Sequence, residues 1–551
     1  MERIVNNVLL VATPSIEYSL EGVSLKEKSI IKVILPLGLA YIGAALRKNS
    51  YNVEIYEPHL ESYEEDNEYT NEELVEIIKN MIIKKIDKAN YDLIGISAPY
   101  IYTYQWAHYI AEVAKRQNKE IPVVVGGGYP SMLVEDVMKD KNLDYLIIGE
   151  GEISIIHLLE YLNSGNSTDI SKISGMAYRI NNKVNINHER TYIEELDRLP
   201  FPAWDLIDYE KHMIFKKERK LHIVSSRGCP YKCTFCGSHK YWGRAFRKRS
   251  AENVLNEIDY LRENFNVKEV DFVDDNMTVD KKWFMTVARG LNDRNLSYRI
   301  NHISSFTTDN EMLQAMKEGG CELISIAIES AVPETLKKLK KPVNLERTLE
   351  LVRHCRKFGI DCYLLFITGL PYDTKEDMLT SFKFAEEAKA DWITFNMLVP
   401  YPSTEIFEYC KDRNYFIDEN LDLSKFTQRN QGFINTEDWD REWVATMTYD
   451  FNIKINFLRN FNMLDDNGNL DSAIAIFEHV IRFHPRHLIV YLSLAYTYKK
   501  KGELDKAEEL LKQASLLLNE KDVQKTYGKY MLWDEEVINF YHSWEKTTVI
   551  L

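Results

Sequence analysis

Short apolar segments alternate with amphipathic segments through residues 8–148, and this alternation constrains the fold more than any other feature of the sequence. The predicted strands are 8–12, 53–56, 93–97, 123–125 and 145–148, and the predicted helices are 40–48, 71–89, 105–117 and 132–139. Strands that alternate with helices form a parallel, doubly wound α/β sheet, which binds ligands at the carboxyl ends of its strands. We therefore expect a Rossmann-like domain over residues 1–165.

Small and polar residues follow four of these strands, at the ends where a ligand would bind. Tight turns alone would explain one such loop, since glycine adopts backbone conformations that other residues avoid. Four loops on one edge favour a large ligand that the backbone approaches closely. The candidate contacts in these loops are Pro14, Ser15, Ser97, Gly126, Gly127, Gly128, Gly149 and Glu150.

A second alternation begins after a connecting segment. We predict that residues 166–220 form a linker, because Pro200 and Pro202 disfavour a continuous helix. The strands predicted beyond it are 222–225, 269–273, 299–304, 323–328, 362–367 and 392–399. Six such repeats predict a partial (βα)6 barrel over 221–410, with its chemistry at the carboxyl ends of the strands.

The remaining segment, 411–551, is predicted to be a helical domain that contains a repeat. The sequence of Gly468–Ala473, GNLDSA, recurs 34 residues later as GELDKA at Gly502–Ala507. This is the period of a tetratricopeptide repeat, which would occupy about 454–520; a plain helical bundle is the alternative. Since such arrays need about three units for stability, we expect this region to pack on the rest of the protein.

Length and charge exclude several classes of protein. A chain of 551 residues is too long for one core, so about three domains are expected. A net charge of −15 argues against a nucleic-acid-binding surface. No apolar run is long enough to span a membrane and no signal peptide is recognisable, so we expect a cytoplasmic protein. One basic run, Arg244–Arg249, is either a solvated helix start or an anion site.

Three cysteines carry the strongest chemical signal. Cys229, Cys233 and Cys236 have the spacing C-x3-C-x2-C and follow the first predicted barrel strand. Thiolates are the usual ligands of iron–sulfur clusters, and three of them leave one iron of a [4Fe-4S] cluster open to a chelating ligand. A structural zinc site that includes His239 is the alternative, although zinc usually takes paired ligands. The other cysteines lack such spacing and are expected to be buried thiols.

This motif resembles that of the radical S-adenosylmethionine (SAM) superfamily, including the aromatic residue, Phe235, before its last cysteine. The resemblance implies that the open iron binds SAM and that the reduced cluster cleaves SAM to a 5′-deoxyadenosyl radical. Segments at later strand ends resemble the SAM-binding parts of the family, in the same order. The residues concerned are Asp274, Asp275, Ser304, Glu329, Gly369 and Pro400, whereas Tyr372-Asp373 departs from the common Gly-Glu.

The acidic pair Asp274-Asp275 is typical of the subfamily that binds cobalamin. Its carboxylates could meet the SAM ammonium group or cap the helix predicted at 278–291. The N-terminal domain also resembles the cobalamin module of that subfamily, through Gly38 in PLGLAY, the Gly126–Gly128 turn and GEGE at 149–152. The signature that places a histidine below cobalt in other cobalamin enzymes is absent. Glu57-Pro58-His59 is superficially similar, but it follows the second strand, where we expect that it cannot play that role.

The resemblance spans about residues 5–405 and implies a cobalamin-dependent radical SAM methyltransferase with a [4Fe-4S] cluster, SAM and cobalamin. Such an enzyme methylates an unactivated carbon of a small-molecule or peptide substrate. Cyclisation or rearrangement with the same cofactors is one alternative, and a non-catalytic iron–sulfur interaction protein is another. We expect a flavodoxin- or ferredoxin-type protein to supply electrons, and the helical tail could bind a protein partner.

Overall fold

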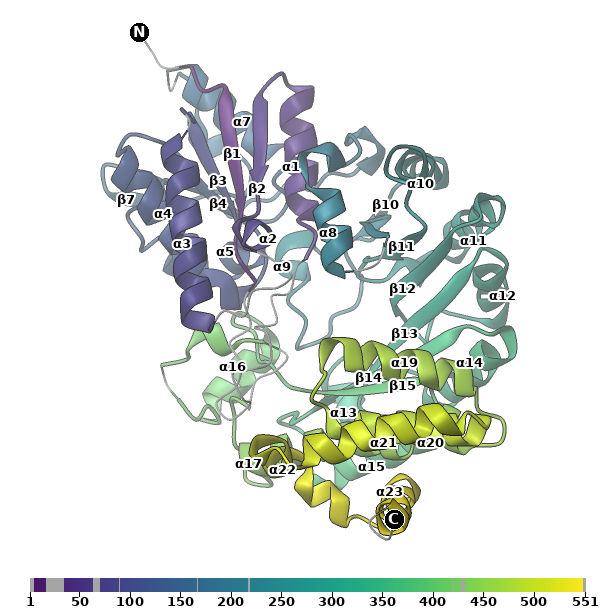
Figure 1. Ribbon diagram of the computed structural model, residues 1–551. Coiled ribbons are helices and arrows are strands. Elements are labelled where there is room, and N and C mark those ends of the chain that lie inside the picture. The colour runs from purple at the N-terminus through teal and green to yellow at the C-terminus, as the bar shows by residue number, and fades with distance from the viewer. Residues whose placement is uncertain are drawn as a thin grey trace.

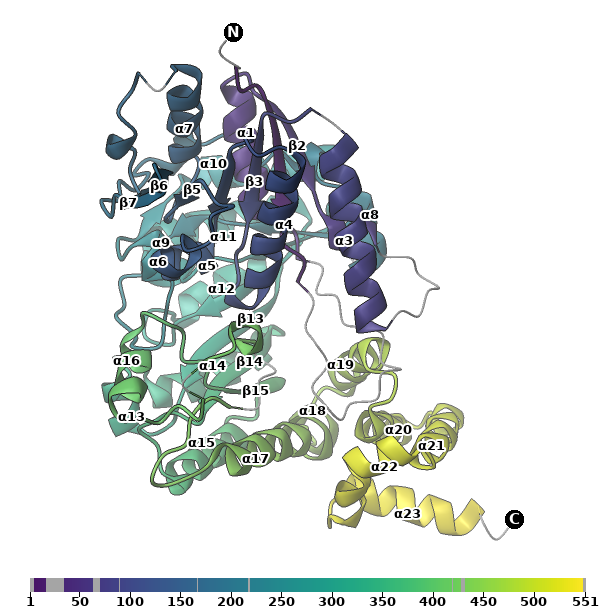
Figure 2. The same cartoon turned by 90° about the vertical axis from the view of Figure 1, so that its left-hand side faces the viewer.

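The computed structural model describes residues 4–15, 34–62, 70–88, 90–165, 167–216, 219–418, 420–427 and 432–548. An N-terminal sheet, an open barrel and a helical tail follow one another along the chain (Figure 1). The two termini lie at opposite ends of the molecule (Figure 2). None of the helices in the described ranges is long and apolar enough to cross a membrane.

The N-terminal sheet is doubly wound, as predicted. Its parallel strands are β1 (Asn7–Ala12), β2 (Asn52–Tyr56), β3 (Leu93–Ser97), β4 (Val123–Gly126) and β5 (Tyr145–Ile147), in the order β2-β1-β3-β4-β5. Helices α1 (Leu37–Lys48) and α7 (Ser154–Asn163) pack on one face, and α3 (Asn71–Lys88) and α4 (Tyr104–Gln117) pack on the other. Strands buried on both faces read as continuous apolar runs, which explains why they were recognisable.

The sheet continues beyond residue 165, where the prediction ended it. Strands β6 (Met176–Ile180) and β7 (Lys183–Ile186) form a hairpin that extends the sheet antiparallel from β5. The segment predicted to be a linker therefore supplies two strands before α8 (Tyr209–Lys216). The turn residues Asn181 and Asn182 both have positive φ, at 51° and 62°, as a two-residue hairpin turn requires.

Two predicted helices also differ from the structure. The helix expected at 132–139 is two short helices, α5 (Gly128–Met132) and α6 (Val134–Val137), because Leu133 has a non-helical backbone with φ −133°. Helix α3 ends at Lys88, and residue 89, the predicted end, lies outside the described residues.

The barrel is an open sheet of six parallel strands, which confirms the predicted partial barrel. In chain order the strands are β8 (Lys220–Ile223), β11 (Glu269–Phe272), β12 (Ser297–Ile303), β13 (Cys321–Glu329), β14 (Asp361–Thr368) and β15 (Trp392–Met397), and they are neighbours in that order. The helices between them cover its convex face (Figure 1). These are α10 (Ala251–Phe265), α11 (Lys281–Leu291), α12 (Asn310–Glu318), α14 (Leu345–Phe358) and α15 (Lys375–Ala388).

Two asparagines cover the free edge of β15. Asn452 of α17 (Arg441–Ile453) bonds both the N–H and the C=O of Phe395, at 3.0 and 2.9 Å. Asn456, one turn later in the π-helical segment η8 (Lys454–Leu458), does the same for Ile393, at 2.9 and 2.6 Å. An open strand edge exposes unpaired backbone groups, and here side-chain amides take the place of a seventh strand.

The repeat forms three helices beside this edge of the barrel, and the middle one packs against η8. They are α19 (Leu470–Phe483), α20 (Leu488–Lys501) and α21 (Leu504–Leu518), and α20 is almost entirely buried between its neighbours. The tail contacts the barrel through Ser472 with Asp361 and through Lys389 with Asp465. The expected packing of the repeat on the rest of the protein is thus observed.

Candidate active site

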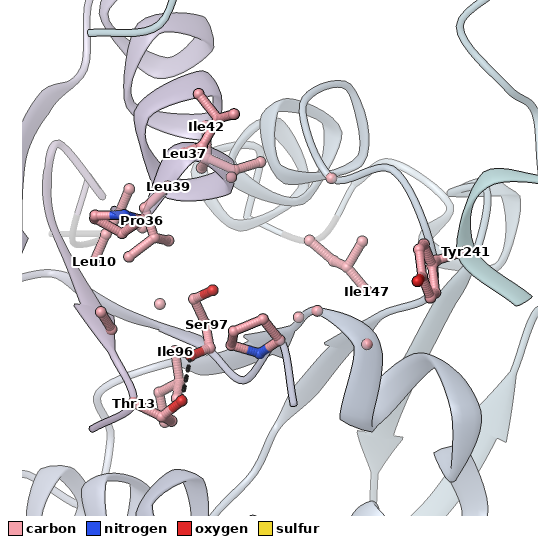
Figure 3. Close-up of a pocket in the computed structure, with 18 of the residues that line it drawn as sticks. Leu10, Thr13, Pro36, Leu37, Leu39, Ile42, Ile96, Ser97, Ile147 and Tyr241 are labelled. Carbon is pink, nitrogen blue, oxygen red and sulfur yellow. Dashed lines mark hydrogen bonds between the residues drawn. The ribbon is translucent and has the colours of Figure 1, made fainter. Parts of the chain in front are cut away.

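A cavity of about 520 Å³ lies at the carboxyl edge of the N-terminal sheet and opens toward the barrel. Its wall is mostly apolar, and Figure 3 shows Tyr241 on the opposite side from Leu10 and Pro36. The predicted ligand residues that line it are Ser15, Gly38, Ser97, Gly126, Gly127, Gly128, Gly149 and Glu150. Pro14 does not line it, whereas its neighbour Thr13 does and donates a hydrogen bond to the Ser97 carbonyl oxygen at 3.0 Å.

The glycines around the cavity have two different functions. Among the described residues, a Cβ atom at Gly38 would meet nothing within 4 Å, and one at Gly126 would meet only Ile147, at 3.9 Å. Gly127 and Gly128 instead pack against the carbonyl oxygens of Ala98 and Pro99, where a Cβ would come within 2.6 and 2.4 Å. Gly38 and Gly126 therefore leave room for a ligand, and the other two allow close backbone packing.

His59 also lines the cavity, although it follows the second strand. Its side chain is buried, and its Nδ1 atom has no hydrogen-bond partner among the described residues. Burial and the neighbouring His212 lower the pKa of His59 to about 3, so its imidazole is neutral. An apolar cavity with open glycines and a buried, unpaired imidazole nitrogen fits a large cofactor such as cobalamin.

The three motif cysteines lie in a loop that faces this cavity from the barrel side. Strands β9 (Ser226–Arg227) and β10 (Arg247–Lys248) pair antiparallel at its base. We call residues 228–246 the cluster loop; it contains Cys229, Cys233, Cys236 and helix α9 (His239–Trp242). The cysteines are half-buried, and burial raises the pKa of each thiol.

The cysteines fit an iron–sulfur cluster better than a zinc ion. Within the described ranges, no three His, Cys, Asp or Glu side chains are grouped closely enough to hold one metal ion. A zinc site requires such a compact tetrahedral group, and His239 Nδ1 lies 3.0 Å from the carbonyl oxygen of Cys236 instead. A [4Fe-4S] cluster binds each thiolate through a different iron, so its ligands stand further apart.

Comparison with known proteins agrees with this geometry. Residues 223–385 match the radical SAM superfamily, residues 30–159 the B12 binding domain and residues 466–529 the tetratricopeptide repeat. An uncharacterized methyltransferase of Pyrococcus horikoshii is 32% identical over 387 residues, which cover 70% of this chain and 80% of that protein. The chain belongs to the B12-binding radical SAM enzymes.

Other relatives are consistent with this family. Cytidylyl-2-hydroxyethylphosphonate methyltransferase of Streptomyces wedmorensis is 30% identical over 77% of this chain and 86% of its own length. The anaerobic magnesium-protoporphyrin IX monomethyl ester cyclase of Rubrivivax gelatinosus is 27% identical over 69% of this chain and 66% of its own length. The cobalamin-dependent SAM radical enzyme OxsB has the same fold, with a TM-score of 0.65 at 15% identity over 98% of this chain and 84% of that one.

Membership of this family makes the protein an enzyme whose cofactors are a [4Fe-4S] cluster, SAM and cobalamin. The alternative of a non-catalytic iron–sulfur protein is therefore wrong. The contacts of individual residues with these cofactors stay predictions.

The acidic pair after β11 contacts both the cluster loop and the strand residues that precede it. Asp274 is buried, and its carboxylate accepts hydrogen bonds from the backbone N–H and hydroxyl groups of Ser225 and Ser226. Burial raises its pKa to about 6, although these hydrogen bonds oppose the rise. Asp275 accepts a hydrogen bond from the Ser238 hydroxyl at 2.6 Å. Neither caps α11, because Asp280 does so, and the predicted cap is therefore wrong.

The remaining SAM-site candidates follow consecutive barrel strands at the same edge. Glu329 ends β13 with φ +71°, and its carboxylate lies 2.9 Å from Lys341 Nζ. The Ser304 hydroxyl after β12 accepts a hydrogen bond from the Phe306 N–H at 3.2 Å. Phe235 is partly buried in the cluster loop, Gly369 has φ +70° after β14, and Pro400 is buried after β15.

The departure from the family pattern at Asp373 has a structural explanation. The carboxylate of Asp373 accepts a hydrogen bond from the Thr335 hydroxyl, and its carbonyl oxygen accepts one from Trp439 Nε1 at 2.7 Å. Burial raises the pKa of Asp373 to about 7. Asp373 thus joins the turn after β14 to a neighbouring helix through its side chain, and to the segment before α17 through its backbone carbonyl.

Sequence reasoning missed the ion pairs around the cluster loop. In the basic run, Arg247 and Arg249 are 4% and 5% exposed and pair with Glu150 and Glu257, so these two arginines are neither solvated nor free to bind an anion. Arg244 and Lys248 of the same run are exposed. The carboxylate of Glu150, predicted as a cofactor contact, is thus already paired.

Proposed function

We propose that this protein methylates an unactivated carbon of a small-molecule substrate, in a reaction that requires both SAM and cobalamin. The observation that carries this proposal is that Tyr241 and Trp242 belong to the cluster loop and also line the cavity. A cofactor in the cavity and a cluster on the loop would therefore flank one reaction space. Relatives named as methyltransferases support the same reaction class.

The chain positions the cofactors and keeps water out. When bound, the reduced cluster supplies the electron that cleaves SAM, and methylcobalamin supplies the methyl group. Cys229, Cys233 and Cys236 would hold the cluster and leave one iron open for SAM. The apolar wall formed by Leu10, Ile96 and neighbouring residues would exclude solvent from the reacting carbon.

Cyclisation or rearrangement is the second candidate, because magnesium-protoporphyrin ester cyclases are among the relatives. The mass of the product distinguishes the two, since methylation adds one CH₂ unit and cyclisation adds none. A flavodoxin- or ferredoxin-type electron donor stays part of the proposal. The tetratricopeptide-like helices could recruit a protein partner, and a peptide substrate remains compatible with the open barrel.

Anaerobic reconstitution tests the proposal. Protein supplied with iron, sulfide and hydroxocobalamin should bind about four irons and one cobalamin per chain, and should form 5′-deoxyadenosine from SAM under reduction. The matched variant replaces Cys229, Cys233 and Cys236 with alanine and should lose iron while it keeps cobalamin. Cluster binding and SAM cleavage without bound cobalamin would overturn the methylation mechanism.

A further inference from the structure

Glu150 joins the wall of the cobalamin cavity to the base of the cluster loop. It belongs to the loop Gly149–Glu152, which lines the cavity after β5. Its Oε1 atom lies 2.7 Å from Arg227 Nη1, and its Oε2 atom lies 2.8 Å from Arg247 Nη1. One carboxylate therefore binds two guanidinium groups from a different part of the chain.

The two arginines stand at the two ends of the cluster loop. Arg227 in β9 and Arg247 in β10 are directly opposite each other in the antiparallel register. Everything between them is the cluster loop, with its three cysteines. Like charges directly opposite each other in a ladder repel. The carboxylate of Glu150 compensates for this repulsion and so helps to hold the loop closed at its base.

These charges are shielded from water. The side chains of Arg227, Arg247 and Glu150 are each 3% exposed, and that of Glu152, which lies 2.5 Å from Arg227 Nη2, is 6% exposed. The positive charges of the two arginines are thus balanced by the negative charges of the two glutamates. Removing one carboxylate would leave a buried cation without compensation, which is strongly unfavourable.

Backbone contacts reinforce the same junction. Gly149 has φ +84°, and a Cβ atom there would come within 2.9 Å of the Tyr241 carbonyl oxygen in the cluster loop. Arg247 Nη2 donates a hydrogen bond to the Trp242 carbonyl oxygen at 2.9 Å. The loop Gly149–Glu152 and the cluster loop therefore share both charged and backbone contacts.

We propose that Glu150 couples the two cofactor sites, so that cobalamin binding orders the cluster loop and cluster assembly strengthens cobalamin binding. This inference rests on the proposed function, since it requires cobalamin in the cavity. Glu150, Arg227 and Arg247 are positioning residues, which act through the loops that they hold. Because coupling between two sites is reciprocal, each cofactor changes the affinity for the other by the same factor.

Hydrogen–deuterium exchange of the full chain tests this without any turnover. Anaerobic protein without a cluster is compared with and without hydroxocobalamin. Cobalamin should slow hydrogen exchange in the loops that line the cavity, which we call the cavity loops, and also in the cluster loop, residues 228–246. In Glu150→Gln the cavity loops should still be protected, but the cluster loop should not. The control variant is Glu257→Gln, which breaks the buried ion pair between Glu257 and Arg249. The side chains of Glu257 and Arg249 are 1% and 6% exposed and do not line the cavity, so this variant should behave as wild type.

An affinity measurement provides the reciprocal test. Reconstituting the cluster should tighten cobalamin binding by about tenfold in wild type and in Glu257→Gln, and by much less in Glu150→Gln. Protection of the cavity loops alone in the wild-type protein would overturn the coupling and leave the proposed function intact. No protection anywhere would overturn both. Equal coupling in Glu150→Gln and wild type would show that another contact carries it and would refute the role of Glu150.

Discussion

Lys341 Nζ lies 2.9 Å from Glu329 Oε1, and their side chains are 17% and 9% exposed. Glu329 ends β13, and the residue before Lys341 presents its carbonyl oxygen 3.8 Å from Cys233 Sγ. The positive charge of Lys341 lowers the pKa of Cys229 and Cys233, although burial outweighs it. The barrel thus holds an ammonium group close to the thiols by pairing it with a carboxylate at a strand end.

Lys341→Met should destabilise the protein by about 3–5 kcal/mol, because it leaves the carboxylate of Glu329 unpaired in a largely buried site. The double variant Lys341→Met/Glu329→Gln should recover most of the loss, since it removes both charges. Urea unfolding measures the free energy of unfolding of the single and the double variant. The neighbouring Lys340 pairs with Glu405 at the surface, where the side chains are 51% and 57% exposed. Lys340→Met should cost less than about 1 kcal/mol, and equal losses in the two variants would contradict this account.

Gly126→Leu should weaken cobalamin binding and leave iron content unchanged. A Cβ atom at this position is tolerated, but a longer side chain would fill the cavity. Overpacking of this kind costs about 1–3 kcal/mol, which corresponds to roughly 5- to 150-fold in affinity. Gly126→Ala is the matched control and should bind nearly as wild type. Absorbance titration with hydroxocobalamin measures the difference, and equal affinity in all three proteins would place the cofactor elsewhere.

Asn456→Leu should loosen the edge of the barrel. The change leaves the buried N–H and C=O of Ile393 without partners, which costs about 2–4 kcal/mol for the two groups. Faster hydrogen exchange in β15 and a lower urea midpoint should follow. Asn539→Leu, on the exposed surface of α23 (Glu536–Thr548), should change stability by less than about 0.5 kcal/mol. An unchanged exchange rate in β15 would show that water or another group replaces the amide.

Local sequence patterns were sufficient for most of the fold. The parallel strands are apolar runs, so the predicted limits of β3, 93–97, are those of the structure. Strands β6 and β7 mix apolar and polar residues at a sheet edge, and the prolines after them favoured a linker. The edge cover provided by Asn452 and Asn456 joins residues 57 and 63 apart in the sequence, and a pattern search along the chain does not reveal such contacts.

The candidate site also has features that the sequence predicted and features that it did not. The cysteine spacing and the open glycines are local signals. The structure places these glycines on the cavity wall and the cysteines in the loop that faces it, and their contacts with the cofactors stay predictions. Glu150, Asp274 and Glu329 were also placed correctly at strand ends, but their partners were not foreseen. Arg227 meets Glu150 across 77 residues of sequence, and only the folded chain brings them together. The positions of these carboxylates after strands were therefore predictable from the sequence, whereas their hydrogen-bond and ion-pair partners were not.

Asp373 should make stability depend on pH between about pH 4 and pH 7. Its pKa is about 7 in the folded protein, against an ordinary value of 3.8, because the carboxyl group is buried. A raised folded pKa means that the stabilisation is complete below pH 3.8 and is lost as the pH rises through 7. The loss amounts to about 4 kcal/mol at most, from three pH units at 1.4 kcal/mol each.

The variant Asp373→Asn tests this dependence. Its side chain keeps an acceptor for the Thr335 hydroxyl and cannot ionise, so the free energy of unfolding of the variant should fall less between pH 4 and pH 7. Urea unfolding at pH 5, 6, 7 and 8 should therefore give a difference between variant and wild type that grows with pH. Parallel pH profiles would mean that Asp373 ionises in the folded protein as it does in the unfolded chain.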